Sequence, residues 1–275
     1  MTEVASLRER QIAAALGKLF VQRRDVKAEQ HKINGKWARK KTPIGMRDVL
    51  DHIRGERSIG HYLLDTDNKC RVFALDIDLR KSVSQYPLVD REGNVTLHEY
   101  IPREAWEDRA HASRLWTKLS LRVVADKIAR VIMDDLELPC LVSYSGSKGL
   151  HVYAFFDQPI DARDAHEGAI LAIEKTGLFK PLRGKNFYEA IDQTPVDGYP
   201  NLEVETYPKQ DAVSKDGYGN LMRLPLGRNF KSRRDTSFFV DMSDHGAELK
   251  PIDPLMALTL RDPYCLGRAT TATGE

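Results

Sequence analysis

The amino-acid sequence predicts an α+β fold with its strands in a mainly antiparallel or mixed sheet. The run RVFALDIDL (71–79) is typical of a strand, since it is apolar apart from its first residue and two aspartates. Apolar segments at 138–144 and 150–156 flank a glycine-containing loop and indicate two more strands. Residues 112–136 and 162–176 repeat apolar residues at helical spacing. Strands mixed with two such helices indicate an α/β or α+β domain, of which we adopt α+β.

The first hundred residues contain fewer regular patterns. Residues 3–20 predict an amphipathic helix, because apolar residues recur near helical spacing at Leu7, Ile12, Leu16 and Phe20. We expect residues 25–48 to be irregular, and HYLLD (61–65) to be a strand. Residues 80–104 contain glycine, proline and many polar residues, which predicts a long loop or insertion.

The two main helices are defined by apolar stripes that we expect to be buried. In the first helix the stripe is Leu115, Leu119, Val123, Ile128, Val131 and Leu136. In the second it is Ala165, Ala169, Ala172 and Ile173. Two further strands are predicted at 201–207 and 220–226, and the tail 269–275 is predicted to be disordered.

Composition excludes several classes of protein. The 275 residues are 41% hydrophobic and 30% charged, which is typical of a soluble globular protein. No apolar run reaches the ~18–20 residues of a membrane span, and the N-terminus lacks the apolar core of a signal peptide. The three cysteines, Cys70, Cys140 and Cys265, are odd in number and far apart, so we expect neither a disulfide framework nor a zinc site. We therefore expect a cytoplasmic location.

Positive charge gathers in two segments, although the net charge is only +2. Residues 22–41 and 227–234 are basic and contain Trp37 and Phe230, a combination that suits a nucleic-acid track. A solvated surface would explain the same runs. The candidate DNA-binding side chains are Arg23, Arg24, Lys40, Lys41, Lys231 and Arg233.

Asp76 and Asp78 alternate with apolar residues in ALDIDL. Residues i and i+2 of a strand share a face, so the two carboxylates would lie side by side and repel each other. A divalent cation relieves that repulsion, and hard oxygen ligands suit Mg²⁺ or Mn²⁺. The alternative is that both aspartates face solvent at a sheet edge.

The segment SGSKGLH (145–151) has the composition of an anion-binding loop. Gly146 and Gly149 allow backbone N–H groups to approach a ligand closely, and the side chains of Ser145, Ser147, Lys148 and His151 supply donors for phosphate oxygens. It is not a Walker A motif, because the GxxxxGK[ST] spacing is missing. A tight hairpin with a solvated lysine is the alternative.

Two later segments add charged candidates. In NLEVETY, Glu203 and Glu205 share a strand face, and one of them could complete a metal site with the aspartates. A surface strand with outward charges is the alternative. In GNLMRLPLGRN, Arg223 lies inside an apolar strand and needs an anionic partner, either a glutamate or a triphosphate. Arg228 and Asn229 follow and could share that task.

The order of these segments is more specific than any one of them. The chain resembles the archaeo-eukaryotic primase (AEP) superfamily, most closely the primase-polymerase domains of TOTE conflict systems and related CRISPR-associated primase-polymerases. ALDID resembles the first motif of the superfamily, YSGSKGLHVY the second, and VETYPKQ with GNLMRLPLG the third. RSIGHYLLDTDNKC and LFVQRRDVKAEQ also look like this subfamily, so the resemblance spans roughly residues 15–230. The second motif is also similar to the polymerase domains of bacterial end-joining ligases.

The resemblance implies a fold, a reaction and residue roles. It implies an α/β module and an RRM-like sheet with the active site in the cleft between them, and template-directed nucleotidyl transfer with two Mg²⁺ or Mn²⁺ ions. Asp76 and Asp78 match the metal-binding pair, with Glu205 as third acid and Glu203 as the alternative. His151 matches the histidine that contacts the triphosphate, and the remaining nucleotide-binding candidates are Ser145, Ser147, Lys148, Gly149, Arg223 and Arg228.

The sequence therefore predicts a primase-polymerase that makes primers or extends them on single-stranded DNA, with dNTPs or NTPs as substrates. An end-filling repair polymerase, a metal-dependent nuclease and a nucleic-acid-binding module are the alternatives. We divide the chain into an N-terminal helical and basic segment (1–45), a catalytic core (46–235) and a C-terminal extension (236–275). The chain has no zinc knuckle or helicase motif, so candidate partners are helicase, nuclease or CRISPR-associated proteins or domains, and no membrane is expected.

Overall fold

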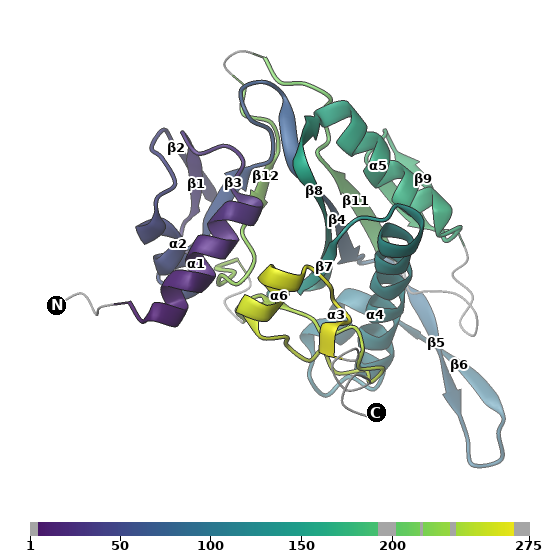
Figure 1. The fold of residues 1–275 in the computed structure, drawn as a ribbon. Helices are drawn as coiled ribbons and strands as arrows, with labels where there is room; N and C mark the ends of the chain where they lie inside the picture. Colours follow the sequence, from purple (N-terminus) through teal and green to yellow (C-terminus); the bar gives the residue numbers. More distant parts are fainter. Residues whose placement is uncertain (1–4, 192–201, 215–216, 232–234, 267–275) are drawn as a thin grey trace, which may run out of the picture.

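A computed structural model describes residues 5–191, 202–214, 217–231 and 235–266. Two antiparallel sheets and the helices around them form the body of the molecule (Figure 1). Every strand pair formed by the described residues in these sheets is antiparallel, which confirms the α+β prediction. No helix in the described ranges is long and apolar enough to cross a membrane.

The larger sheet has seven strands in the order β13-β7-β8-β4-β11-β10-β9. Its bounds are β4 (Lys69–Leu79), β7 (Cys140–Tyr144), β8 (Gly149–Asp161), β9 (Phe179–Arg183), β10 (Phe187–Ala190), β11 (Leu202–Tyr207) and β13 (Phe238–Phe239). One face packs on α4 (Arg114–Arg130) and α5 (Ala162–Lys175), through residues such as Leu75 and Ile77. A π-helical turn, η1 (Val131–Asp135), continues α4.

The smaller sheet has four strands in the order β12-β3-β1-β2. It consists of β1 (Lys27–Gln30), β2 (Trp37–Lys40), β3 (Ile59–Tyr62) and β12 (Leu221–Arg223), so strands far apart in the sequence lie side by side (Figure 1). With α1 (Leu7–Phe20) and α2 (Met46–Ile53) it forms the left half of that view. Because β1 pairs with β3, strands from the predicted segments 1–45 and 46–235 share this sheet. The division of the chain into three segments stays a prediction.

A second core lies where α1 and the smaller sheet meet the larger sheet. Leu16 and Phe20 of α1 pack with Val72 and Ala74 of β4 and with Tyr153 of β8. The apolar positions Val72 and Ala74 share a face with Asp76 and Asp78, because side chains alternate along a strand. This face of β4 is therefore apolar at one end and acidic at the other. α6 (Pro254–Leu260) covers α1 and β13.

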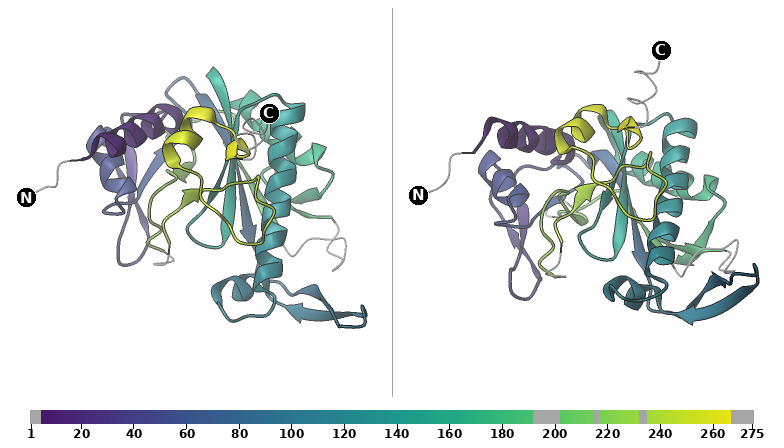
Figure 2. Two further views of the ribbon diagram at one scale, coloured as in Figure 1. Left: turned by 60° about the horizontal axis from the view of Figure 1, so that its bottom comes forward. Right: turned by 90° about the horizontal axis from the view of Figure 1, so that it is seen from below.

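Residues 80–104 are not a loop, contrary to the prediction. They form a hairpin of β5 (Ser84–Val89) and β6 (Val95–Tyr100), which projects from the body in both views of Figure 2, followed by α3 (Pro102–Glu107). The hairpin turn is closed by Asp90, whose Oδ1 accepts from the backbone N–H groups of Glu92 and Asn94 at 2.8 Å. Most of the hairpin is exposed, so it lacks the buried alternation that identifies strands from sequence.

Several element predictions need correction and others are confirmed. Residues 25–48 are not irregular, since they contain β1, β2 and the start of α2; these strands are only four residues long and largely polar. β3 begins before HYLLD, and β12 ends before Leu224. In α4 the buried stripe is Leu121, Val124, Ala125, Ile128 and Ala129, whereas Leu115 is exposed. The stripe of α5 and the burial of Leu16 and Phe20 are confirmed.

Candidate active site

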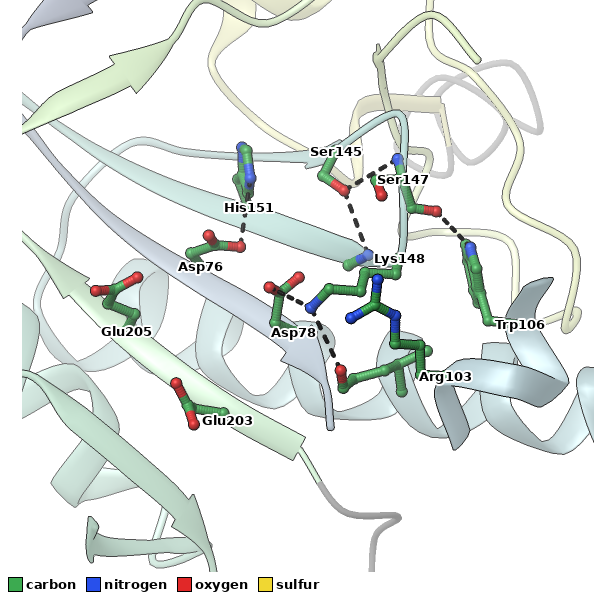
Figure 3. Close-up of polar contacts among 12 residues, drawn as sticks. Asp76, Asp78, Arg103, Trp106, Ser145, Ser147, Lys148, His151, Glu203 and Glu205 are labelled. Carbon is green, nitrogen blue, oxygen red and sulfur yellow. Dashed lines mark hydrogen bonds and ion pairs between the residues drawn. The ribbon is translucent and has the colours of Figure 1, made fainter. Parts of the chain in front are cut away.

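The larger sheet places its polar side chains in two rows across neighbouring strands. In the first row His151 of β8 lies opposite Asp76 of β4, which in turn lies opposite Glu205 of β11. In the second row Gly149, Asp78 and Glu203 are opposite one another in the same way. Residues directly opposite in an antiparallel pair point to the same face. All four carboxylates therefore lie on one face, as Figure 3 shows.

A cavity of about 220 Å³ opens between the two sheets above the aspartates. Asp76, Asp78 and His151 line it from the larger sheet, and Gln30, Trp37 and Arg223 line it from the smaller sheet. The cavity thus brings together most of the candidate metal- and nucleotide-binding side chains, namely Asp76, Asp78, Ser145, Ser147, Lys148, His151 and Arg223, together with Lys231.

Asp76 and Asp78 have different surroundings. Burial raises the pKa of the Asp76 carboxyl, but the attraction of His151, Lys148 and Arg223 outweighs burial and lowers it below its ordinary value. Burial and then the charge of Asp76 raise the pKa of Asp78, against the opposing effect of Lys148, whose Nζ lies 2.5 Å from Asp78 Oδ2. The pair therefore carries one strongly ionised carboxylate and one whose ionisation is costly.

His151 Nε2 lies 3.3 Å from Asp76 Oδ1, and its Nδ1 lies 2.9 Å from the Tyr153 hydroxyl. Apart from this contact with His151, the buried Asp76 Oδ1 has no hydrogen-bond partner among the described residues. A buried carboxylate oxygen with so little compensation is costly, so a cation would stabilise it. His151 is held in place from the side of Tyr153, with Nε2 directed toward the cavity.

The 145–149 loop is fixed by hydrogen bonds from several elements (Figure 3). Ser145 Oγ accepts from the backbone N–H groups of Ser147 and Gly149, both at 3.3 Å. The Ser147 carbonyl accepts from the Tyr144 hydroxyl at 2.9 Å and from the indole N–H of Trp106, on α3. Because its backbone groups are tied in this way, the loop presents its serine hydroxyls and lysine in a fixed arrangement.

Arg223 connects the smaller sheet to this loop. It lies opposite Gly60 on β3, and its guanidinium donates to the Ser145 carbonyl. Burial lowers the pKa of the Arg223 guanidinium, and Asp76 partly offsets that effect. The predicted need of Arg223 for an anionic partner is therefore only partly met by the protein itself.

The two glutamates of β11 lie on the acidic face but do not line the 220 Å³ cavity. Glu205 accepts from the Tyr207 hydroxyl at 2.9 Å and forms an ion pair with Lys209. Glu203 forms an ion pair with Arg183 at 2.8 Å. Among the residues whose placement is described, no group of three or more His, Cys, Asp or Glu is arranged to hold a metal ion.

The remaining candidates lie away from the cavity. Arg228 is exposed, and Lys40 and Lys41 are exposed at the end of β2. Arg23 is buried, donates to Asp25 at 3.0 Å and lies over the ring of Tyr218, whereas Arg24 donates to the Gly17 carbonyl at 3.0 Å. Arg233 lies outside the described residues.

Comparison with known proteins places the chain in a family. The family model described as "TOTE conflict system, Archaeo-Eukaryotic Primase domain" matches residues 16–253. The chain belongs to this primase family. The match confirms the resemblance drawn from ALDID, YSGSKGLHVY and VETYPKQ, and it supports nucleotidyltransferase activity at the level of the family.

Among solved structures, this primase domain is similar to the "Polymerase Domain from Mycobacterium tuberculosis Ligase D in complex with DNA". The identity is 12% and the TM-score 0.48, with 95% of this chain and 89% of that chain covered. No curated protein matches the primase domain by sequence.

Sequence reasoning missed several residues around the site of this primase domain. Gln30 and Tyr207 line the 220 Å³ cavity, and Trp106 holds the 145–149 loop. Tyr207 could have been found, because it follows Glu205 by two positions and so shares its strand face. Gln30 belongs to the segment 25–48, for which an irregular structure is predicted, and Trp106 lies just beyond the predicted loop 80–104. No local pattern in the sequence identifies either residue.

Proposed function

We propose that the chain is a primase-polymerase, which synthesises primers on single-stranded DNA, extends them, or does both. One observation carries the proposal: the paired aspartates of β4 and the phosphate donors of the 145–149 loop face one cavity, between the two sheets. Transfer of a nucleotide from a triphosphate needs carboxylates for metal ions beside donors for phosphate oxygens. A nuclease needs the carboxylates but has no use for a triphosphate cradle.

Asp76 and Asp78 fit a divalent cation such as Mg²⁺ or Mn²⁺. Apart from His151 Nε2 at 3.3 Å, the buried Asp76 Oδ1 has no hydrogen-bond partner in the described part of the chain, and burial beside Asp76 raises the pKa of Asp78. Both features are relieved by a hard cation with oxygen ligands. Glu205, directly opposite Asp76, is the proposed third acid, and Glu203, opposite Asp78, is the alternative.

Two such ions, when bound, would acidify the attacking hydroxyl and neutralise the leaving pyrophosphate. The residues of the chain position the reactants. Lys148, His151 and Arg223 bind the triphosphate and offset the charge that builds up on it. The 3′-oxygen of the primer, or of an initiating nucleotide, then bonds to the α-phosphorus as the bond to pyrophosphate breaks. The proton of that hydroxyl passes to solvent.

The exposed strand β2 is the proposed start of the nucleic-acid track. The side chain of Trp37 lines the cavity and is 37% exposed, so it can stack on a base. Lys231 at the cavity is positioned to contact template phosphates. Lys40 and Lys41, exposed at the end of β2, would extend the track, although Lys40 lines a different cavity from Trp37. The other proposed DNA-contacting residues are Arg23, Arg24 and Arg233, and Arg228 is a proposed nucleotide-binding residue. We also propose helicase, nuclease or CRISPR-associated partners and a cytoplasmic location.

An unprimed synthesis assay tests the proposal. The protein is mixed with single-stranded DNA, labelled dNTPs or NTPs, and Mg²⁺ or Mn²⁺, and a parallel reaction carries a primer. Products without primer are expected, and Asp76→Asn and Asp78→Asn are expected to abolish them while the thermal midpoint is kept. Products only with a primer would indicate an extending or end-filling polymerase. No product in either reaction, or full activity in both variants, would refute the assignment.

A further inference from the structure

A second cavity, of about 300 Å³, lies beside the 145–149 loop. Among the described residues that line it, five are cationic and two are acidic, Glu107 and Asp235. The cationic residues are Arg103, Arg109, Arg114, Lys148 and Lys231. They come from α3 and the segment after it, from α4, from the loop, and from the chain beyond β12. No motif in the sequence identifies this site. Of its cationic residues, only Lys148 and Lys231 are among the binding residues that the sequence predicts.

The two acidic side chains are already engaged within the protein. Glu107 accepts from Arg103 Nε at 3.3 Å, and Asp235 accepts from the Tyr144 hydroxyl at 3.0 Å. Arg114 Nε is buried and has no hydrogen-bond partner among the described residues. An arginine N–H that is buried without an acceptor is costly, and the geometry of a guanidinium matches phosphate oxygens. The cavity therefore has the positive charge expected of an anion site, and one of its lining residues, Arg114, has an N–H without an acceptor in the described part of the chain.

The two cavities share part of their lining at the loop. Ser147, Lys148 and Lys231 line both of them. Figure 3 shows the order of the groups: Glu203 and Glu205 lie on one side of Asp76 and Asp78, and Lys148 with Arg103 lies on the other. A chain of phosphates that begins at the aspartates and passes Lys148 would thus enter the second cavity.

We propose that this second cavity binds the terminal phosphates of the incoming nucleoside triphosphate, and hence the pyrophosphate that leaves. The inference rests on the proposed function and adds a subsite to it. In an in-line displacement the attacking hydroxyl and the leaving group lie on opposite sides of the transferred phosphoryl group. The second cavity lies on the cationic side of the aspartates, so the hydroxyl would approach from the side of Glu203 and Glu205.

The arrangement predicts that the protein distinguishes nucleotides by their number of phosphates. A monophosphate would reach only the aspartates and the donors of the first cavity. The triphosphate would add charge-assisted hydrogen bonds to Arg103 and Arg114, which are the stronger kind. The preference for triphosphates over monophosphates should therefore depend on these two arginines, whereas binding of the base and sugar should not.

Titration calorimetry with dATP, dADP and dAMP, in Mg²⁺ and without template, tests the subsite. The variants are Arg114→Gln and Arg103→Gln, the latter carrying the test if the former does not fold. Arg130→Gln is the matched control, because Arg130 also lies on α4 but pairs with Asp126 outside both cavities. We expect each pocket variant to weaken dATP binding about tenfold and to leave dAMP binding unchanged, with the control like the wild type.

The outcomes separate the subsite from the function. If the wild type binds dATP and both pocket variants bind it equally well, the subsite is refuted while the proposed function stands. If the variants weaken dAMP as much as dATP, the arginines do not contact terminal phosphates. If the variants spare dATP but weaken a 5′-phosphorylated oligonucleotide, the cavity holds a nucleic-acid phosphate and our assignment is wrong. If the wild type binds none of the nucleotides, the proposed function fails as well.

Discussion

Replacing Gly149 with alanine is expected to displace the 145–149 loop from Asp76 and Asp78. Gly149 lies opposite Asp78 where β8 and β4 pair. A Cβ at this position would lie 2.2 Å from the Ile77 carbonyl oxygen and 2.6 Å from Asp78 Oδ1. Carbon–oxygen contacts between strands are normally about 3.3 Å or longer, so the two strands would have to separate locally by about 1 Å. The obstacle is backbone, which no side-chain rotation removes.

The magnitude follows from that separation. A backbone hydrogen bond that lengthens by about 1 Å is effectively lost, and overpacking of this kind costs about 2–3 kcal/mol of unfolding free energy. A displacement of about 1 Å between reacting groups can lower a rate about 100-fold. We therefore expect Gly149→Ala to remain folded at low temperature, to unfold at lower urea concentration, and to lose about two orders of magnitude in kcat/KM.

Primer extension and urea denaturation measure the two effects. Gly168→Ala is the matched control, since Gly168 lies in α5 and a Cβ there would meet Phe73 at an ordinary 3.4 Å. The control should keep its activity and stability, because alanine favours a helix over glycine. Wild-type activity and stability in Gly149→Ala would refute the reasoning that strand spacing at Gly149 sets the geometry of the site.

Three further predictions concern the two sheets and the loop. Burial lowers the pKa of His61 from 6.5 to about 3, so the unfolded state binds the proton more readily and the free energy of unfolding falls as the pH drops below about 6.5. Between about pH 7.5 and about pH 5, His61→Phe should reduce this loss of unfolding free energy by about 2 kcal/mol. Urea-unfolding free energies that fall in parallel with pH in the wild type and the variant would contradict this. Trp106→Phe removes the donor to the Ser147 carbonyl and should raise the nucleotide KM about fivefold at little cost in thermal stability, whereas an unchanged KM would show that this hydrogen bond does not position the loop. Glu205→Gln should lower metal-dependent synthesis about 100-fold and Glu203→Gln less than about tenfold, and the reverse order would make Glu203 the third acid.

Local patterns were sufficient to predict which candidate side chains share a strand face. Asp76 and Asp78 had to share a face, because the alternating Leu75 and Ile77 could only be buried against the helices. The glycines of the loop indicated close approach of a ligand, which stays a prediction; the structure shows instead that Gly149 lets the strands β8 and β4 approach closely. Family motifs then suggested roles for these residues; the family match confirms the resemblance, and the roles stay a prediction.

Elements that bury little apolar surface could not be predicted in this way. The β5–β6 hairpin and the four-residue strands β1 and β2 carry mostly exposed or polar residues. Neither the alternation of apolar residues typical of a strand nor the apolar spacing typical of a helix therefore appears in their sequences. In α4, small alanines allow close packing and the buried stripe includes Ala125 and Ala129, which a search for large apolar residues overlooks.

The sequence by itself determined which side chains are the candidates for the chemistry, because alternation along a strand and glycine in a loop are local properties. Only the tertiary structure decided what these side chains face. The register of β11 against β4 places Glu205, and not Glu203, opposite Asp76. The pairing of β12 with β3 brings Arg223 to the loop, and α3 places Arg103 beside Lys148. These contacts join segments distant in the chain, and they are set by packing of the two cores, which no local pattern encodes.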